Sequence, residues 1–173
     1  MACNATLAGI GVPCKSKIGG VHKVLLSQWE DGFWNAASAG AIDDCAASQT
    51  VLTYEIAKGS GSFNQTVDAS LENGAVAFTQ ELTFNIAGYD AATLSEIHEV
   101  MQSRLAVVVV DMNGQGFVMG ALNGAECSGG TAGVGQGASD LHGLQVTLTA
   151  IENAPAPTGP STTGGNLTVT AAP

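Results

Sequence analysis

Hydrophobic and polar positions alternate with a period of two along most of this chain. Such alternation is typical of β-strands with one buried and one solvated face. It predicts strands at residues 20–29, 50–57, 63–70, 75–88, 105–111, 116–122 and 144–151, and a weaker one at 166–170. The clearest is 75–88, which spans roughly 40 Å. One face of that strand is apolar apart from Gln80; its other members are Val76, Phe78, Leu82, Phe84 and Ile86.

One segment instead has the spacing of an amphipathic helix, beginning at Ala91 or Leu94 and ending at Arg104. Thr93 and Glu96 fit a capping box, and Asp90 is the alternative N-cap. The apolar stripe of this helix consists of Leu94, Ile97, Met101 and Leu105, with Val100 beside it. The residues therefore predict a mainly β fold with one helix.

The segments between these elements carry turn signals. Residues 35–48 are small and weakly patterned, and 124–140 are rich in glycine, so both are predicted to be loops. Asn73-Gly74 predicts a type I′ hairpin turn between the strands 63–70 and 75–88. We expect one domain over 1–157. The Pro/Gly/Thr-rich segment 158–173 is then either a flexible extension or an added edge strand.

Composition supports a folded sheet protein. The 173 residues are 45% hydrophobic and 12% charged, with 23 glycines. The formal charge is −10, and from Gln28 onward fifteen acids face only Lys58 and Arg104. A nucleic-acid binder normally clusters Lys and Arg, so this class is disfavoured. We expect no secretory signal and no membrane span, and therefore reduced thiols at Cys3, Cys14, Cys45 and Cys127.

Asp111-Met112-Asn113-Gly114 resembles the start of a calcium loop but equally suits a β-turn. An EF-hand loop needs a ligand at position 5, glycine at position 6 and glutamate at position 12. Here glycine comes at position 4 and Leu122 occupies position 12. The sequence favours the turn, with Asp111 and Asn113 shaping it and Gly114 permitting it.

Other chemical motifs are incomplete. His98-Glu99 begins an HExxH-like run, but Gln102 stands where the second histidine belongs, so a structural histidine is favoured. Gly133, Gly135 and Gly137 precede a strand rather than a helix, which argues against a phosphate loop. Asp140 to Gly143 form a second Asp-x-x-Gly turn. Glycosylation triplets begin at Asn4, Asn64 and Asn166. We therefore assign no catalytic, cofactor-binding or metal-binding residue, and a structural or binding protein is favoured over an enzyme.

The order of five segments resembles the major tail tube protein of tailed bacteriophages. These segments are GGVHKVLL, FNQTVDASLENGAVAFTQELTFNI, LSEIHEVMQSR, LAVVVVDMNGQGFVMGALNGAE and GVGQGASDLHGLQVTLTAIENAPAP. The resemblance covers 17–157 and leaves out 35–48 and 158–173.

The resemblance implies two packed antiparallel sheets, in a β-sandwich or barrel-like arrangement, with one flanking helix. It implies a homo-oligomer of hexameric rings that stack into a tube, with joined sheets lining a lumen through which DNA passes during ejection without specific binding. The expected partners are tape-measure, terminator and baseplate proteins. The expected location is the virion tail, assembled in the cytoplasm of the bacterial host, with no cofactor.

Two alternatives stay open. One is another virion β-protein, such as a head decoration or head–tail connector subunit, which forms trimers or single rings. The other is an extracellular adhesion or carbohydrate-binding sandwich, for which disulfides and calcium-dependent stability are expected.

Overall fold

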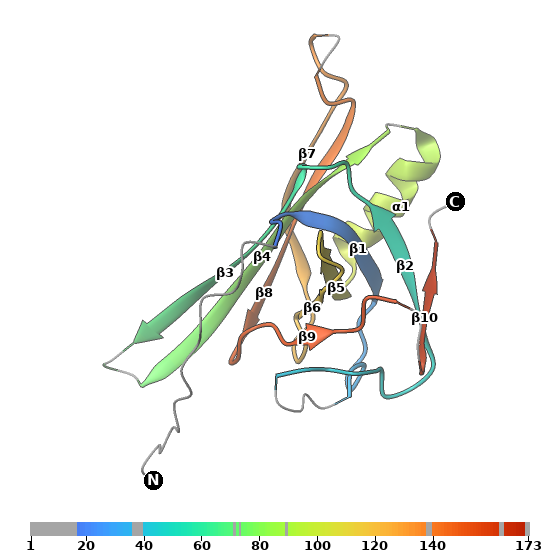
Figure 1. The fold of residues 1–173 in the computed structure, drawn as a ribbon. Coiled ribbons are helices and arrows are strands. Elements are labelled where there is room, and N and C mark those ends of the chain that lie inside the picture. Colours follow the sequence, from blue (N-terminus) through green and yellow to red (C-terminus); the bar gives the residue numbers. More distant parts are fainter. Residues whose placement is uncertain are drawn as a thin grey trace.

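Two β-sheets pack face to face in a computed structural model that describes residues 17–35, 40–70, 72, 74–88, 90–137, 140–162 and 165–171 (Figure 1). Within these residues the fold is mainly β with a single helix, which confirms the predicted fold class. One sheet has the strand order β10 (Leu167–Thr170), β2 (Gln49–Glu55), β1 (Val21–Gln28), β5 (Leu105–Asp111), β6 (Gly116–Met119), β9 (Thr158–Gly159). The other has the order β3 (Gly61–Ser70), β4 (Ala75–Ala87), β8 (Gly143–Glu152), β7 (Glu126–Gly133). Neighbours are antiparallel, except that β10 runs parallel to β2.

The six-stranded sheet is buried on both faces. Along β5, Val107 and Val109 enter the core between the two sheets, whereas Val108 and Val110 enter a second core on the opposite face. The second core is closed by a segment that follows β1 and by β10; the covering side chains are Phe33, Trp34, Ile42, Cys45 and Leu167. The period-two pattern predicted a wet face for 50–57, and this is wrong in part, because Val51 is buried in the second core and Ile56 in the first.

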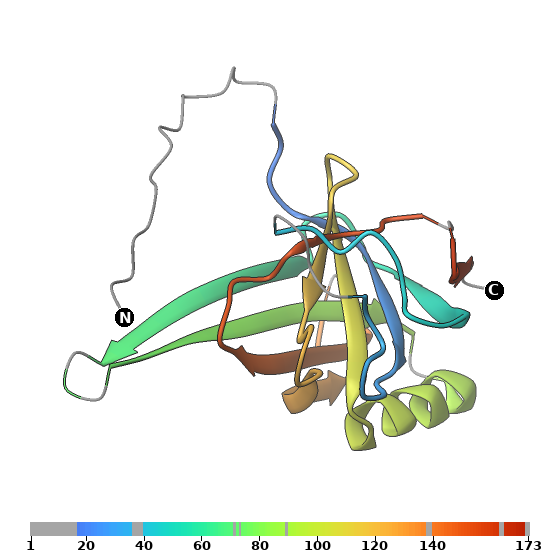
Figure 2. The same ribbon diagram turned by 90° about the horizontal axis from the view of Figure 1, so that it is seen from below.

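The β3–β4 hairpin extends well beyond the rest of the molecule (Figure 2). Its base contributes Leu82 and Phe84 to the core between the sheets. Farther out, the same face is uncovered, and Val67 and Val76 are 56% and 52% exposed. The apolar face predicted for 75–88 is thus buried only where the six-stranded sheet lies opposite it.

The hairpin turn differs from the predicted one. A two-residue type I′ turn centred on Asn73 and Gly74 would pair residues 72 and 75. The observed register pairs Ser70 with Ala75, so 71–74 form the connection. Gly74 does have a positive φ of 62°. Asn73 lies outside the described residues.

Helix α1 (Ala91–Gln102) begins at the alternative cap. Asp90 Oδ1 accepts a hydrogen bond from Thr93 N at 2.9 Å. Glu96 does not complete a capping box here, because its Oε1 accepts a hydrogen bond from the hydroxyl of Tyr54 on β2. Burial, followed by this hydrogen bond, raises the pKa of Tyr54. Of the predicted apolar stripe on α1, Ile97 and the flanking Val100 are buried, while Leu94 and Met101 are partly exposed.

In the C-terminal half, the structure differs from the predicted extent of one loop and of one strand. The glycine-rich segment 124–140 is not all loop, because β7 occupies Glu126–Gly133 and pairs with β8. The strand predicted at 116–122 ends at Met119, where a turn begins at Gly120 with a φ of 66°. Residues 40–48 are irregular as predicted, and 36–39 lie outside the described residues.

The C-terminal segment joins the six-stranded sheet at two places. The strand predicted at 166–170 is present as β10 and extends the edge formed by β2. A short strand that the sequence pattern did not predict, β9, pairs with β6.

The core between the sheets gives a direct test of this packing. Leu148 on β8 is fully buried, and Leu148→Ala should lower the free energy of unfolding by about 2–5 kcal/mol through lost burial and a cavity. Ile151 lies on the same strand but is 61% exposed, so Ile151→Ala should cost less than about 1 kcal/mol. Urea unfolding followed by circular dichroism measures both. Equal losses would contradict the described facing of β8.

Candidate assembly surface

The four-stranded sheet has one buried and one open face. Alternation places Leu144, Val146 and Leu148 of β8 in the core, so their neighbours point the other way. The pairing aligns the outward residues in rows across the strands, Ser62–Thr83–Thr147 and Asn64–Glu81–Thr149. The open face is consequently composed mainly of hydroxyl, amide and carboxylate side chains.

Hydrogen bonds link side chains along this face. The hydroxyls of Thr83 and Thr147 are 3.2 Å apart. Thr149 Oγ1 donates to Ser128 Oγ at 2.7 Å, and Thr79 Oγ1 donates to Asp68 Oδ2 at 3.3 Å. Cross-strand pairs of this kind stabilise a sheet surface without a covering layer.

Both edges of this sheet are open. The strand order places β3 at one edge and β7 at the other, and no strand among the described residues pairs with their outer sides. Most residues of both strands are exposed. An open edge presents unpaired backbone N–H and C=O groups and is a template for pairing with another chain.

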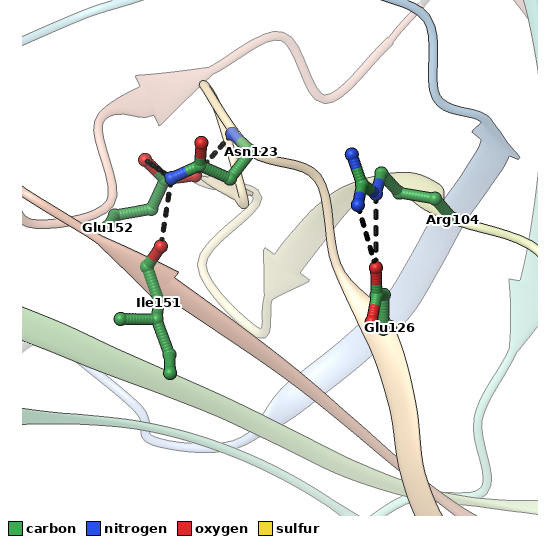
Figure 3. Close-up of polar contacts among 5 residues, drawn as sticks. All are labelled: Arg104, Asn123, Glu126, Ile151 and Glu152. Atoms are coloured by element: carbon green, nitrogen blue, oxygen red, sulfur yellow. Dashed lines mark hydrogen bonds and ion pairs between the residues drawn. The ribbon is translucent and has the colours of Figure 1, made fainter.

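The electrostatic character of the sheet is acidic. None of its four strands contains Lys or Arg, and their acids are Asp68, Glu81, Glu126 and Glu152. Glu126 is paired with Arg104 from outside the sheet: Arg104 Nε donates to Glu126 Oε1 at 3.1 Å, and Nη2 is 3.1 Å from the same oxygen (Figure 3). The guanidinium also lies 5.3 Å from the ring centroid of Trp29.

Two buried polar side chains join the four-stranded sheet to the turn that follows β6. Gln80 of β4 is 1% exposed, and its Oε1 accepts from Gly120 N at 3.0 Å. Glu152 of β8 is 4% exposed, and its Oε1 accepts from Leu122 N at 3.1 Å and Asn123 N at 2.8 Å. Asn123 Nδ2 donates to Ile151 O at 3.0 Å (Figure 3). Buried acceptors satisfied by backbone donors fix this turn against the sheet.

The Asp111 motif forms a turn between β5 and β6. Asp111 Oδ1 accepts from Asn113 N and Gln115 N, both at 2.8 Å. Gly114 N donates to Asp111 O at 3.1 Å, and the φ of Gly114 is 81°. Desolvation raises the pKa of Asp111, but hydrogen bonds from Asn113 and Gln115 outweigh it and leave the pKa lowered. The carboxylate is thus committed to the turn, as the turn interpretation requires.

The glycine loop between β7 and β8 is closed by its own acid. Asp140 Oδ2 accepts from Gly137 N at 2.7 Å and from Gln136 N at 2.9 Å. These backbone hydrogen bonds lower the pKa of Asp140. The amides of Gln136 and Gly137, which a phosphate loop would aim at its ligand, are therefore already engaged by a carboxylate.

The remaining motif residues lie apart. His98, predicted to be a structural histidine, is exposed on α1, and its Nε2 is 3.1 Å from Gln102 Nε2. Cys45 and Cys127 are free thiols, and burial followed by the charge of Asp44 raises the pKa of Cys45 to about 11. Cys3, Cys14 and Asn4 lie outside the described residues. Asn64 lies on β3, and Asn166 belongs to a hydrogen-bonded clasp described below.

Asp44 fastens the C-terminal strand to the second core. Its Oδ1 and Oδ2 accept from Asn166 N at 2.9 and 2.7 Å, and Oδ1 also accepts from Cys45 N at 2.8 Å. Asn166 Nδ2 donates to Cys45 O at 3.0 Å, and Leu167 beside it is fully buried. The backbone hydrogen bond from Asn166 is the main cause of the lowered pKa of Asp44.

Within the described residues, no group of three or more His, Cys, Asp and Glu side chains is placed to hold a metal ion. No helix in that part of the chain is long and apolar enough to cross a membrane. Comparisons with protein-family models, curated proteins and solved structures found no match.

Sequence reasoning missed the two polar anchors. Gln80 was recognised as the polar exception on an apolar face, which is the signal of a buried and satisfied amide. Glu152 continues the inward alternation of β8 after Leu148 and Ala150, but it stands beyond the strand predicted at 144–151. Neither pattern predicts that the turn after β6 supplies the backbone N–H donors.

The Glu152 anchor should be sensitive to loss of its acceptor atoms. Glu152→Ala leaves the N–H groups of Leu122 and Asn123 without their buried acceptor, so the free energy of unfolding should fall by about 1–3 kcal/mol. Glu152→Gln retains one acceptor oxygen and should lose less. Glu81→Ala removes an exposed carboxylate and serves as the control. Urea unfolding ranks the three, and a loss at Glu81 equal to that at Glu152 would contradict the anchor.

The Asp44 clasp should be sensitive to acid. A lowered folded-state pKa means that the carboxylate stabilises the fold fully above its unfolded pKa, near 3.8, and loses this contribution as pH falls through the folded pKa. The stability difference between wild type and Asp44→Asn should therefore shrink between about pH 5 and pH 2. Urea unfolding across this range measures it, with Asp31→Asn as an exposed control. Parallel curves for wild type and Asp44→Asn would contradict the clasp.

Proposed function

We propose that this protein is a tail tube subunit of a tailed bacteriophage. In this proposal, copies of the chain form hexameric rings, the rings stack into a tube, and the four-stranded sheets join around the lumen that conducts DNA. The subunit performs no chemistry. Its partners are further copies of itself and the tape-measure, terminator and baseplate proteins, and its location is the virion tail. The order of segments in the sequence motivates the proposal.

The observation that carries the proposal is a sheet open at both edges. Because β3 and β7 are at opposite edges, β3 of one copy and β7 of the next supply a repeating, head-to-tail pairing. A ring made in this way closes the four-stranded sheets into a barrel and removes both of their open edges. Such a ring also explains why β3 and β7 remain largely exposed in a single copy.

The outer face of the sheet has the chemistry that a DNA conduit needs. Affinity for DNA comes largely from Lys and Arg that neutralise phosphates. The four strands contain neither residue, and their outward side chains are mostly Thr, Ser, Asn and Gln with a few acids. A lumen of this composition solvates DNA and repels its phosphates, so the polymer can slide without being held.

Electron microscopy of the purified protein tests the proposal. We expect tubes of uniform width built from stacked rings, at near-neutral pH and concentrations at which rings are populated. Discrete rings or trimers that never stack would favour the connector or decoration alternative. A protein that stays monomeric across concentration and salt would contradict the assembly altogether.

Proline substitutions at the β7 edge test the pairing itself. Successive N–H groups of a strand point to opposite sides, so one of Thr131 and Ala132 directs its N–H to β8 and the other to the open edge. Thr131→Pro and Ala132→Pro are both made, and the variant that keeps the native circular dichroism spectrum is the informative one. It should abolish rings, because proline removes an edge donor. Val134→Pro, just beyond β7, is the control and should still assemble.

A further inference from the structure

The tip of the β3–β4 hairpin combines exposed apolar and acidic side chains. Val67 and Val76 lie on the same face of the ribbon, because Val67 pairs with Phe78 and Val76 with Ala69. Asp68 is exposed on the neighbouring strand position, and Glu72 is exposed in the connection. β3 and β4 contain no Lys or Arg, so the tip is acidic with an apolar centre.

A cleft of matching character lies between the two sheets. It has a volume of about 420 Å³, and its apolar wall includes Val21, Phe63, Val109 and Phe117. The rings of Phe63 and Phe117 stack across it with centroids 6.4 Å apart. The mouth is also lined by Gly20 and Gly61, at the beginning of β1 and of β3.

Two lysines lie near this mouth. Lys17 precedes Gly20 and acts electrostatically on Asp111, a residue of the cleft wall. Lys58 stands in the turn that leads to Gly61. Within the described residues the one salt bridge joins Arg104 to Glu126, so neither lysine is held in an ion pair.

One acidic group is also present at this mouth. The carboxylate of Asp111 is already engaged by the turn that follows β5. Two lysines against one acid make the mouth slightly cationic, in a chain whose formal charge is −10. The acidic tip and this mouth are therefore complementary in charge as well as in apolar surface.

The two surfaces of one copy are kept apart by the hairpin. Gly61 begins β3 beside Val21, whereas Asp68 lies ~23 Å farther along the strand at about 3.3 Å per residue. The two strands are paired along their whole length, so the hairpin is extended and its tip points away from the other strands (Figure 2). Complementary surfaces that cannot meet within a copy can meet between copies.

We propose that the hairpin tip of one copy docks into the inter-sheet cleft of a second copy. Val67 and Val76 enter the apolar cleft, and Asp68 and Glu72 approach Lys17 and Lys58. The contact joins two different surfaces, so it repeats from copy to copy and closes into a ring or continues as a filament. This inference rests on the proposed function, because it assigns one of the contacts between tube subunits.

A charge-reversal experiment tests the docking. Asp68→Lys with Glu72→Lys reverses the tip, and Lys17→Glu with Lys58→Glu reverses the cleft mouth. Each double variant alone should raise the concentration needed for assembly at least tenfold, measured by sedimentation and electron microscopy. An equal mixture should recover assembly, because a reversed tip meets a reversed mouth and a wild-type tip meets a wild-type mouth. Glu30→Lys with Asp31→Lys makes the same charge change on an exposed turn and should assemble as wild type does.

The outcomes separate the two proposals. Wild-type tubes with unaffected double variants would overturn the docking and leave the tail tube proposal standing. Defective variants that the mixture does not rescue would also overturn the docking, provided that circular dichroism shows both to be folded. A wild-type protein that forms no assembly would overturn both proposals.

Photocrosslinking identifies the occupant of the cleft. With p-benzoylphenylalanine replacing Val67, an equal mixture of ¹⁴N- and ¹⁵N-labelled protein is irradiated and digested. Mixed-isotope crosslinks to peptides containing residues 20–21, 61–65 or 109–117 are expected. Crosslinks confined to one chain, including any to residues 1–16, would overturn the docking.

Discussion

The structure depends on the burial of β5 on both faces. The four valines of β5 alternate between two cores, so this strand needs an apolar layer on each face of its sheet. The six-stranded sheet itself cannot provide either layer, because its strands lie beside β5 and not above or below it. The four-stranded sheet provides the first layer. The segment after β1 and the C-terminal strand provide the second, with Phe33, Trp34 and Leu167 as its main side chains. The C-terminal strand is consequently a structural part of the second core.

As a result, only one face of the four-stranded sheet is buried within a single copy. Its inner face covers β1 and β5, and Leu82, Phe84, Val146 and Leu148 are buried there. Its outer face has nothing left to cover and is polar, and its edges β3 and β7 have no partners among the described residues. The features that favour assembly are therefore a direct result of how one copy satisfies its own core, because the second layer was recruited from loops and short strands rather than from another sheet.

Local signals in the sequence were sufficient where a feature depends on neighbouring residues. The Asp111–Gly114 turn, the Asp90 cap and the strands β1, β4, β5 and β8 follow from side-chain spacing and turn chemistry. The pattern failed where distant segments decide. β7 is largely glycine, serine and alanine, and it is a strand because β8 pairs with it. The two-sided burial of Val51 and Ile56 depends on β10 and on the opposite sheet, neither of which a period of two reveals. The open edges of the four-stranded sheet could not be predicted from local patterns, since they are a property of strand order.

Gln80 and Glu152 mark where the body ends and the hairpin begins. Both side chains face inward beneath the turn that follows β6. There they accept backbone hydrogen bonds from that turn, where an apolar side chain would make packing contacts. Farther out than Gln80, Val76 and Val67 have the same inward direction but are exposed. A two-stranded ribbon alone is only marginally stable in water, so a ribbon that continues past its own core needs another surface to order it. Because the anchors are polar, the inter-sheet core cannot extend outward to provide that surface. The outer part of the hairpin is thus left without a covering layer among the described residues.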